Sequence, residues 1–282
     1  MYGDPSGADD RGGAYMNLLV VTPTLGKSRW LEETVASVHS LPVACRHILV
    51  CPEAEQSGLE KRFPHTQVMT EPDGGMYAAI NHALKTAPAW EVFTYINDDD
   101  LLLPGLAASV RAAASVGAGR PLLVYGRVRL IDRTGRRIGA IPISPRPALN
   151  RRLYALRLEP VYQQGTLITR AAWELLGGFD PALHLCGDSE LLARACLSGL
   201  PFRRVSRTVA AFRLTAGQLS KNRVAMEAER RWIDEKLGLI TPSSWHHQAA
   251  RLAFRIFNLP VYAERIARHG FVSFDQMLAR LG

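Results

Sequence analysis

Three consecutive carboxylates, Asp98, Asp99 and Asp100, follow Asn97 at the end of an apolar run. Adjacent carboxylates repel one another, so holding them on a structured edge costs stability unless a cation or hydrogen-bond donors compensate. A hard divalent cation such as Mg²⁺ or Mn²⁺ prefers oxygen ligands of this kind. Asp99 or Asp100 also fits the cap of a following helix, with Pro104 in its first turn. The cluster therefore predicts a metal site, with a helix cap as the alternative for one of its acids.

The carboxylates belong to a repeated pattern of strands and helices. Residues 91–96 form an apolar run that leads directly into the cluster. Further apolar runs predict strands at 17–22, 47–51 and 67–69, and apolar spacing predicts helices at 31–38 and 76–84. This alternation is typical of a mostly parallel sheet covered by helices, and we expect an α/β fold. Such sheets bind ligands beyond the carboxyl ends of their strands, which is where the three acids lie.

A second set of elements is expected beyond residue 120. Residues 122–128 and 137–141 flank a turn-like sequence, DRTG, and predict a hairpin. Residues 143–160 contain Pro145, Pro147 and several arginines, and we interpret them as a mobile loop. The later elements are expected to be strands at 165–168 and 205–212, helices at 171–176 and 188–197, and basic helices from about residue 221 onward.

The length and composition allow one large core with extensions. The chain has 282 residues, of which 47% are hydrophobic, so it needs no disulfide or metal clip for stability. Residues 1–15 are rich in Gly and Asp, and we expect them to form a flexible tail. One domain is expected over residues 16–220, with its two halves meeting at about residue 120. A helical extension is expected over residues 221–282.

The cysteines and the net charge limit the compartment and the partners. The four cysteines lie in apolar runs without C-x-x-C spacing, which argues against a zinc knuckle or a disulfide framework. No stretch approaches the roughly 20 apolar residues of a membrane span, and the first residues lack a signal-peptide pattern. We therefore expect a cytoplasmic protein. Its net charge of +8 suits nucleic acid, an anionic membrane face or a phosphorylated small molecule, and does not choose among them.

Several motifs, taken in order, resemble those of the family 2 inverting glycosyltransferases with the GT-A fold. Residues 97–100 (NDDD) resemble the D-x-D-type metal motif of that family. Pro23 and Thr24 are similar to its opening nucleotide-binding turn, and residues 71–81 (EPDGGMYAAIN) to its D-x-G-x-Y-x-A-x-N segment. Residues 163–166 with 176–180 resemble its acceptor-side stretch, and residues 187–191 (GDSEL) resemble the motif that bears its catalytic base. The resemblance covers roughly residues 16 to 220.

The resemblance implies a Rossmann-like GT-A fold and a site in two halves. Mn²⁺ or Mg²⁺ would be bound by Asp98 and Asp100 and would bridge the diphosphate oxygens, and Asp99 is assigned no ligand role. Asp188 would be the catalytic base, with Glu190 in a supporting role. The donor-binding residues would be Pro23, Thr24, Glu53, Asp73, Gly74, Tyr77, Asn81, Asp98 and Arg213.

Most of these residues also fit a structural role. Asp188 fits a helix N-cap, and Arg213 fits a solvated strand end as well as a phosphate clamp. Tyr77 and Asn81 share one helix face, and Tyr77 suits the core as well as a nucleotide pocket. Gly74 is most simply part of a turn.

The sequence departs from the family pattern at two positions. Glu53 is the only acid near the end of the second strand, where the family often has adjacent acids followed by Gly-Ser. It suits contact with a nucleobase or an exposed loop equally well. Gly187 stands where a second acid is common, which leaves Asp188 as the stronger base candidate.

The expected activity is inverting transfer of a sugar from a nucleotide-diphosphate donor to a hydroxyl group. The acceptor would be a sugar, a lipid-linked molecule or a glycan, in bacterial polysaccharide, glycolipid or glycan assembly. A sugar nucleotidyltransferase would want a Gly-rich basic loop after the first strand, whereas residues 22–27 contain one glycine. A basic nucleic-acid or membrane-binding module ranks behind both, and no nucleic-acid partner is expected. The basic C-terminal helices suggest peripheral contact with the inner face of the membrane.

Overall fold

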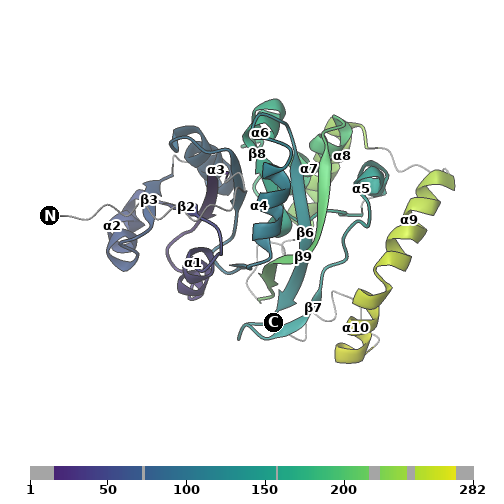
Figure 1. Ribbon diagram of the computed structural model, residues 1–282, viewed down its shortest axis with the longest axis horizontal. Coiled ribbons are helices and arrows are strands. Elements are labelled where there is room, and N and C mark those ends of the chain that lie inside the picture. The colour runs from purple at the N-terminus through teal and green to yellow at the C-terminus, as the bar shows by residue number, and fades with distance from the viewer. Residues whose placement is uncertain (1–15, 72–73, 157, 216–222, 240–244, 271–282) are drawn as a thin grey trace.

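The computed structural model describes residues 16–71, 74–156, 158–215, 223–239 and 245–270. Its strands are β1 (Leu18–Pro23), β2 (Cys45–Cys51), β3 (Gln67–Thr70), β4 (Val92–Tyr95), β5 (Leu101–Leu102), β6 (Leu123–Ile131), β7 (Arg137–Ala140), β8 (Thr166–Thr169) and β9 (Phe202–Arg213). Within the described residues they form one nine-stranded sheet in the order β3-β2-β1-β4-β8-β6-β9-β5, with β7 beside β6 (Figure 1).

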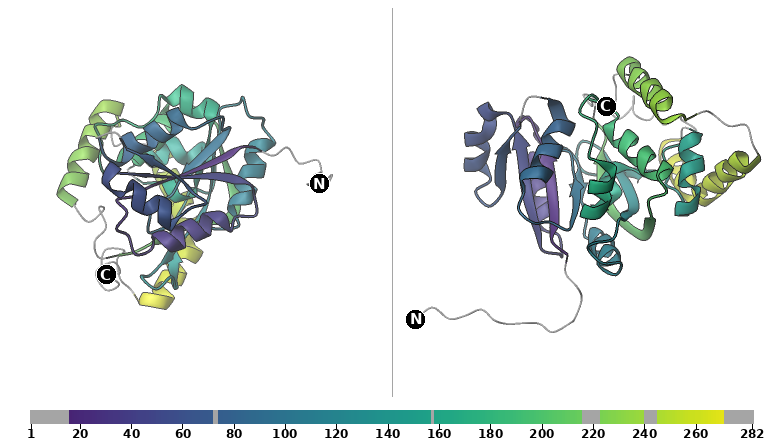
Figure 2. Two further views of the ribbon diagram at one scale, coloured as in Figure 1. Left: turned by 90° about the vertical axis from the view of Figure 1, so that its left-hand side faces the viewer. Right: turned by 90° about the horizontal axis from the view of Figure 1, so that it is seen from above.

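Helices lie on both sides of this sheet (Figures 1 and 2). The α-helices are α1 (Leu31–His39), α2 (Glu53–Arg62), α3 (Gly75–Thr86), α4 (Leu106–Ala114), α5 (Asn150–Ala155), α6 (Arg170–Leu176), α7 (Gly187–Leu197), α8 (Arg223–Leu237), α9 (Trp245–Phe257) and α10 (Leu259–His269). Two short 3₁₀ helices, η1 (Pro147–Leu149) and η2 (Gln163–Gly165), precede α5 and β8. The predicted α/β class is confirmed.

The N-terminal half of the sheet is parallel, and the second half is mixed. β1 pairs in parallel with β2 and β4, and β2 pairs in parallel with β3. β8 then pairs antiparallel with both β4 and β6, and so joins the two halves. β6 pairs in parallel with β9, whose far end pairs antiparallel with the short β5. The predicted hairpin is confirmed as the antiparallel pair of β6 and β7.

Side-chain alternation along β1 divides the core into two layers. Leu18 and Val20 pack in a cluster with residues of α1 and α4. Leu19 and Val21 point the other way, into a cluster with α3, α6 and α7. Because successive side chains of a strand face opposite sides, a strand covered on both sides must be apolar throughout. This explains the uninterrupted apolar run that marks β1 in the sequence.

The prediction of a loop over residues 143–160 is wrong for its central part, which forms η1 and α5. Leu153 of α5 is fully buried against Ala250 and Phe254 of α9. Tyr154 of α5 is buried in the cluster that contains residues of α7. The arginines and prolines of this segment hid a short apolar turn whose packing partners come later in the chain. The helices expected beyond residue 221 are confirmed where they are described, and the tail over residues 1–15 lies outside the described residues.

Candidate active site

The carboxylate cluster lies in the loop that joins β4 to β5, at the carboxyl end of β4. Thr24, just beyond β1, donates a hydrogen bond from its Oγ1 to Oδ2 of Asp98 over 2.5 Å. Ser28 donates to the backbone oxygen of Asp98 over 2.9 Å. Burial raises the pKa of Asp98, and the hydrogen bond from Thr24 opposes that rise. The structure therefore brings together two residues that the sequence assigned to the donor side from separate motifs.

Asp100 is fully buried, and protein donors occupy both of its carboxylate oxygens. Oδ1 accepts from the backbone N–H of Arg213 over 2.8 Å, and Oδ2 accepts from Nε2 of Gln164 over 3.1 Å. Burial and the neighbouring charge of Asp99 raise the pKa of Asp100 well above its ordinary value. This environment does not support the metal-ligand role expected for Asp100. Asp99 is partly exposed instead.

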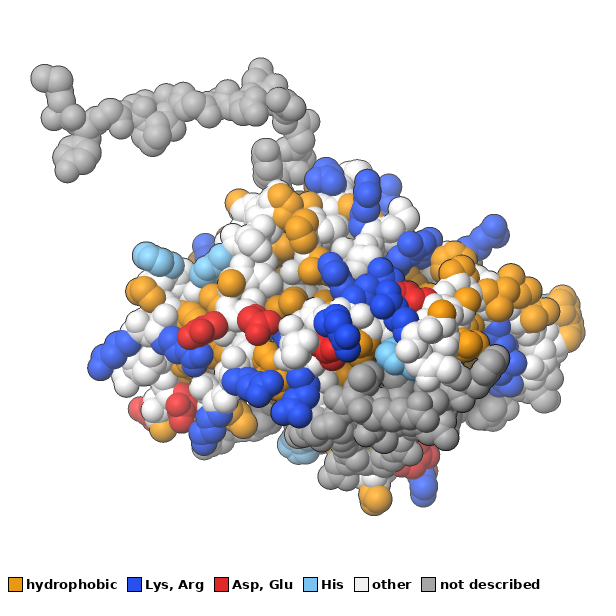
Figure 3. Space-filling model, turned by 90° about the horizontal axis from the view of Figure 1, so that it is seen from below, with side chains coloured by type: hydrophobic (Ala, Val, Ile, Leu, Met, Phe, Trp, Pro, Cys, Tyr) orange, Lys and Arg blue, Asp and Glu red, His pale blue; other side chains and the backbone are white. Residues whose placement is uncertain are grey.

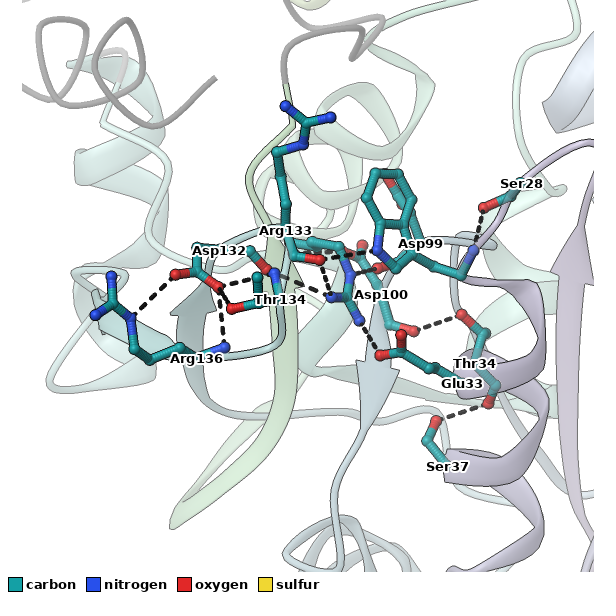
Figure 4. Close-up of polar contacts among 12 residues, drawn as sticks. Ser28, Glu33, Thr34, Ser37, Asp99, Asp100, Asp132, Arg133, Thr134 and Arg136 are labelled. Carbon is teal, nitrogen blue, oxygen red and sulfur yellow. Dashed lines mark hydrogen bonds and ion pairs between the residues drawn. The ribbon is translucent and has the colours of Figure 1, made fainter.

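Arg213 is buried beneath the cluster and does not suit the expected phosphate clamp. Its guanidinium donates to the backbone oxygen of Asp99 over 2.8 Å and to Oε2 of Glu33 over 2.6 Å. It also donates to the backbone oxygens of Asp132 and Arg133 in the turn between β6 and β7. Figure 4 shows Glu33, Asp99 and this turn converging on one network. Arg213 therefore holds the carboxylate loop in place through buried hydrogen bonds.

Asp188, in the first turn of α7, lies in a largely apolar recess that also involves Tyr95 and Phe179. Its Oδ1 accepts hydrogen bonds from Oη of Tyr77 over 3.2 Å and from the backbone N–H of Ser189 over 2.8 Å. Burial and the negative charge of Glu159 raise the pKa of Asp188 to about 6, although the two hydrogen bonds oppose that rise. A carboxylate of this basicity is suited to accept a proton near neutral pH.

Tyr77 contacts the base candidate and belongs to the core. Its ring is buried and packs on Phe179, with the ring centroids 5.1 Å apart. A Cβ atom at Gly187 would come within 2.7 Å of this ring. The glycine that departs from the family pattern therefore makes room for Tyr77 against the start of α7.

The side chain of Asn81 is hydrogen-bonded within the protein. Its side-chain amide donates to the backbone oxygen of Phe179 over 2.9 Å, and its Oδ1 accepts from the backbone N–H of Phe179 over 3.0 Å. These two bonds hold the turn before α7 and use both ends of the amide. The expected donor-binding role of Asn81 is therefore not supported.

The remaining candidates lie in or beside β1, α2 and α3, or outside the described residues. Pro23 is the last residue of β1, and Glu53 is the exposed first residue of α2. Gly74 is exposed directly before α3, and its φ of 152° is a conformation that favours glycine. Asp73 is not among the described residues.

Helix α8 supports residues 184–188, called here the base segment because they lead into and include the base candidate Asp188. It does so through residues that the sequence did not single out. The carboxylate of Glu229 accepts from the backbone N–H groups of His184, Leu185 and Cys186, with shortest distances of 2.9, 3.0 and 2.8 Å. Arg230 donates to Glu159 over 2.6 Å. No local pattern marks Glu229 or Arg230 within the charged helix, since their role depends on a segment more than forty residues away.

Glu190, which was expected to support the catalytic base, is buried and forms two ion pairs. It pairs with Arg194 over 2.7 Å and with Lys236 of α8 over 3.1 Å. Lys236 also pairs with Asp180 over 2.6 Å. Glu190 thus ties α7 to α8 through ion pairs.

The carboxylates allow a particular kind of metal site. In the described part of the chain, no three His, Cys, Asp or Glu side chains are grouped to hold a metal ion. Asp98 and the partly exposed Asp99 provide two oxygen donors at the sheet edge. Mg²⁺ is commonly held by one or two carboxylates together with substrate phosphates. The donor set fits an ion shared with a diphosphate and does not fit an ion caged by protein alone.

The sequence matches no family model and no curated protein. Solved structures resemble it in fold. Residues 1–349 of TarS from S. aureus, in complex with UDP-GlcNAc, have a TM-score of 0.60 and 14% identity, covering 93% of this chain and 78% of that one. The mannosyltransferase PcManGT from Pyrobaculum calidifontis, in complex with GDP-Man and Mn²⁺, has a TM-score of 0.55 and 14% identity, covering 94% of this chain and 79% of that one. These likenesses confirm the fold that the motif resemblance implied.

Proposed function

We propose that this chain, which has the GT-A glycosyltransferase fold, transfers a sugar from a nucleotide-diphosphate donor to an acceptor hydroxyl with inversion. The observation that carries the proposal is Asp188, a carboxylate in an apolar recess with its pKa raised to about 6. Its partner Tyr77 lies on the helix that follows the donor-side glycines. A base of this kind is what removal of a hydroxyl proton requires.

The donor side is proposed to be Asp98 and Asp99 with Thr24. Thr24 fixes one carboxylate oxygen of Asp98, and Asp99 replaces Asp100 as the second metal-ligand candidate because it is partly exposed. Mn²⁺ or Mg²⁺ bound there would stabilise the negative charge that develops on the leaving diphosphate. Glu53, Asp73 and Gly74 stay candidates for contact with the donor, as do Pro23 and the backbone around it.

The proposed chemistry is one displacement. Asp188 takes the proton of the acceptor hydroxyl, and the oxygen attacks the anomeric carbon while the bond to the diphosphate breaks. The electron pair of that bond leaves with the nucleoside diphosphate. We assign the protein no covalent nucleophile, so one displacement inverts the anomeric centre.

The proposed acceptor carries the hydroxyl group from which Asp188 takes the proton. A sugar, a lipid-linked molecule or a glycan of bacterial polysaccharide, glycolipid or glycoprotein assembly suits the expected chemistry. Occurrence in the cytoplasm fits a nucleotide-sugar donor and the four free cysteines.

Donor binding tests the first half of the proposal. The melting temperature of the purified protein would be measured with UDP-, GDP- and dTDP-sugars, with and without Mn²⁺. A ligand that binds only the folded state raises that temperature, so one donor class should stabilise the protein, and more so with the metal. Asp99→Asn should remove the metal-dependent part, whereas Glu174→Gln, on the exposed surface of α6, should not.

Product analysis with that donor tests the second half. Asp188→Asn should lower transfer by about a hundred-fold or more while leaving donor binding intact. Release of a nucleoside diphosphate is expected. Release of pyrophosphate from a sugar phosphate and a nucleoside triphosphate would instead identify a nucleotidyltransferase, and full transfer by Asp188→Asn would refute the role of the base.

A further inference from the structure

The outer side of α9 and α10 carries an apolar stripe, formed by Trp245, Leu252, Ile256, Leu259 and Ile266. The first four side chains are more than half exposed, and the spacing between members is three, four or seven residues. That spacing puts them on one side of a helix. Six of the eleven exposed large hydrophobic side chains in the described residues belong to these two helices, and the others are scattered. Figure 3 shows hydrophobic side chains gathered at the edge that α9 and α10 form.

The two helices carry the stripe as one unit. At the junction, the backbone N–H of Asn258 donates to Phe254 O over 3.1 Å, and the N–H of Tyr262 donates to Asn258 O over 3.1 Å. The side chain of Asn258 is buried and exchanges hydrogen bonds with both backbone groups of Ile143. The junction between the two helices is therefore held against the rest of the protein by hydrogen bonds.

The opposite side of both helices is already packed. Ala250 and Phe254 of α9 cover Leu153. On α10, Glu264 pairs with Arg137 over 2.8 Å, and His269 bonds to the backbone oxygen of Ile138 over 2.7 Å. The stripe therefore stays exposed when α9 and α10 are packed against the protein. A partner that covers it must come from outside the part of the chain that the structure describes.

The charges of these helices select among the possible partners. Residues 245–269 contain four arginines and one glutamate, and that glutamate already pairs with Arg137 and Arg268. Arg255 is exposed next to the stripe and has no acidic partner among the described residues. The whole chain carries a formal charge of +8. A second copy would bring the same arginines and the same charge to the contact, whereas an anionic surface complements both.

We infer that the stripe docks this protein on an anionic lipid surface, with α9 and α10 lying in the plane of the headgroups. A helix with a Trp/Leu/Ile side, a basic remainder and low overall hydrophobicity binds membranes in this way. Trp245, at the start of the stripe, suits the boundary because the indole has an apolar body and a polar N–H. Among the described helices, none is long and apolar enough to cross a bilayer.

Vesicle sedimentation of the full chain tests this inference. Binding would be measured to phosphatidylcholine vesicles with and without phosphatidylglycerol, in the absence of donor and acceptor. Strong binding is expected only to the anionic vesicles, and it should weaken with salt. The double variant Leu252→Glu/Ile256→Glu should lower partitioning about a hundred-fold or more, because two apolar side chains are no longer buried. Arg255→Ala should lower it roughly five-fold.

The matched control is Val116→Glu/Leu175→Glu, which changes two exposed apolar side chains outside the stripe. It should bind as the unchanged protein does. Equal binding by the stripe variant would overturn the inference. So would an absence of vesicle binding together with a dimer that dissociates in the stripe variant, measured by sedimentation equilibrium, since the stripe would then pair two copies. Neither measurement depends on the proposed transfer activity, so the two proposals fail separately.

Discussion

At the scale of single residues, the basicity of Asp188 is set by its surroundings. Burial and the charge of Glu159 favour its protonated form, and the hydrogen bonds from Tyr77 and Ser189 favour the ionised form. Burial and the charge of Glu159 outweigh the two hydrogen bonds, so the pKa of Asp188 is raised to about 6. Glu159 lies on the loop before β8. The other charged or titratable groups that act on this region include Tyr77 of α3, Tyr95 of β4, Tyr154 of α5, Tyr162, Cys186, and Glu229 and Arg230 of α8.

This balance predicts the pH dependence of transfer. A base must be ionised to act, so kcat/KM should fall as the pH drops below about 6. Glu159→Gln removes a negative charge and leaves Arg230 without its partner, and both changes favour ionised Asp188. The acid limb of the pH profile should therefore move to lower pH in Glu159→Gln. It should stay in place in the surface control Glu174→Gln, and an unmoved limb in both would contradict the assignment.

Arg213 makes a prediction about stability. Its side chain is fully buried and serves backbone oxygens of the carboxylate loop and of the turn between β6 and β7. Arg213→Met removes the buried donors to these oxygens and the ion pair with Glu33, and it should lower the free energy of unfolding by about 3 kcal/mol, measured by chemical denaturation. Arg207→Met, on the exposed side of the same strand, should change it by roughly 0.5 kcal/mol or less. Equal effects would show that the network contributes nothing.

Local motifs marked some candidate site residues, and the contacts of others could not be foreseen from them. Thr24, Asp98 and Asp188 have a local signal, in a turn, a strand end and a helix start, and their site roles stay predictions. The expected roles of Arg213 and Asn81 are not supported, because their partners lie far along the chain, Glu33 in one case and Phe179 in the other. Sequence spacing does not reveal which polar side chain will be buried against which backbone group.

At the scale of elements, α8 holds the base segment in place through hydrogen bonds. Glu229 accepts from three successive backbone N–H groups directly before α7, which places the start of that helix. Hydrogen bonds to a charged group are stronger than neutral ones, so one side chain fixes the segment that leads into Asp188.

Replacing Glu229 should therefore affect catalysis at a distance. Glu229→Gln keeps the shape but loses the charge, and we expect kcat to fall by about ten-fold, because a misplaced catalytic group costs rate. The affinity for the donor, measured by calorimetry, should change little, since the donor-side residues belong to other elements. Glu235→Gln, on the exposed side of the same helix, is the control. A loss of donor affinity equal to the loss of kcat would point to general unfolding.

Elements with an apolar side were predicted well, and those without one were not. β1, β2 and β4 are buried on both sides and read as continuous apolar runs. α2 has a single buried residue, Leu59, and gave no helical pattern. α5 is short and is buried by α7 and α9, which come later in the chain, so its own sequence resembles a loop.

At the scale of the whole molecule, the expected division at residue 220 stays a prediction, and the contacts of α8 count against treating that helix as part of a separable extension. Ile233 of α8 is buried in the same cluster as Leu19 and Tyr77. Arg230 and Lys236 pair with residues before position 220. α9 and α10 differ, since one side of each is packed and the other carries the stripe.

Because Glu229 supports residues 184–186, it also determines at which point of its synthesis the protein becomes able to catalyse transfer. The ribosome makes the chain from the N-terminus, so every proposed site residue is translated before the side chain that orders the base segment. A nascent chain released before α8 would contain Asp98, Asp99 and Asp188 yet lack the contacts that position the last of them. We therefore expect no transfer by unfinished chains, and messages truncated before the codon for Arg223, the first residue of α8, should yield products that contain every proposed site residue and are inactive.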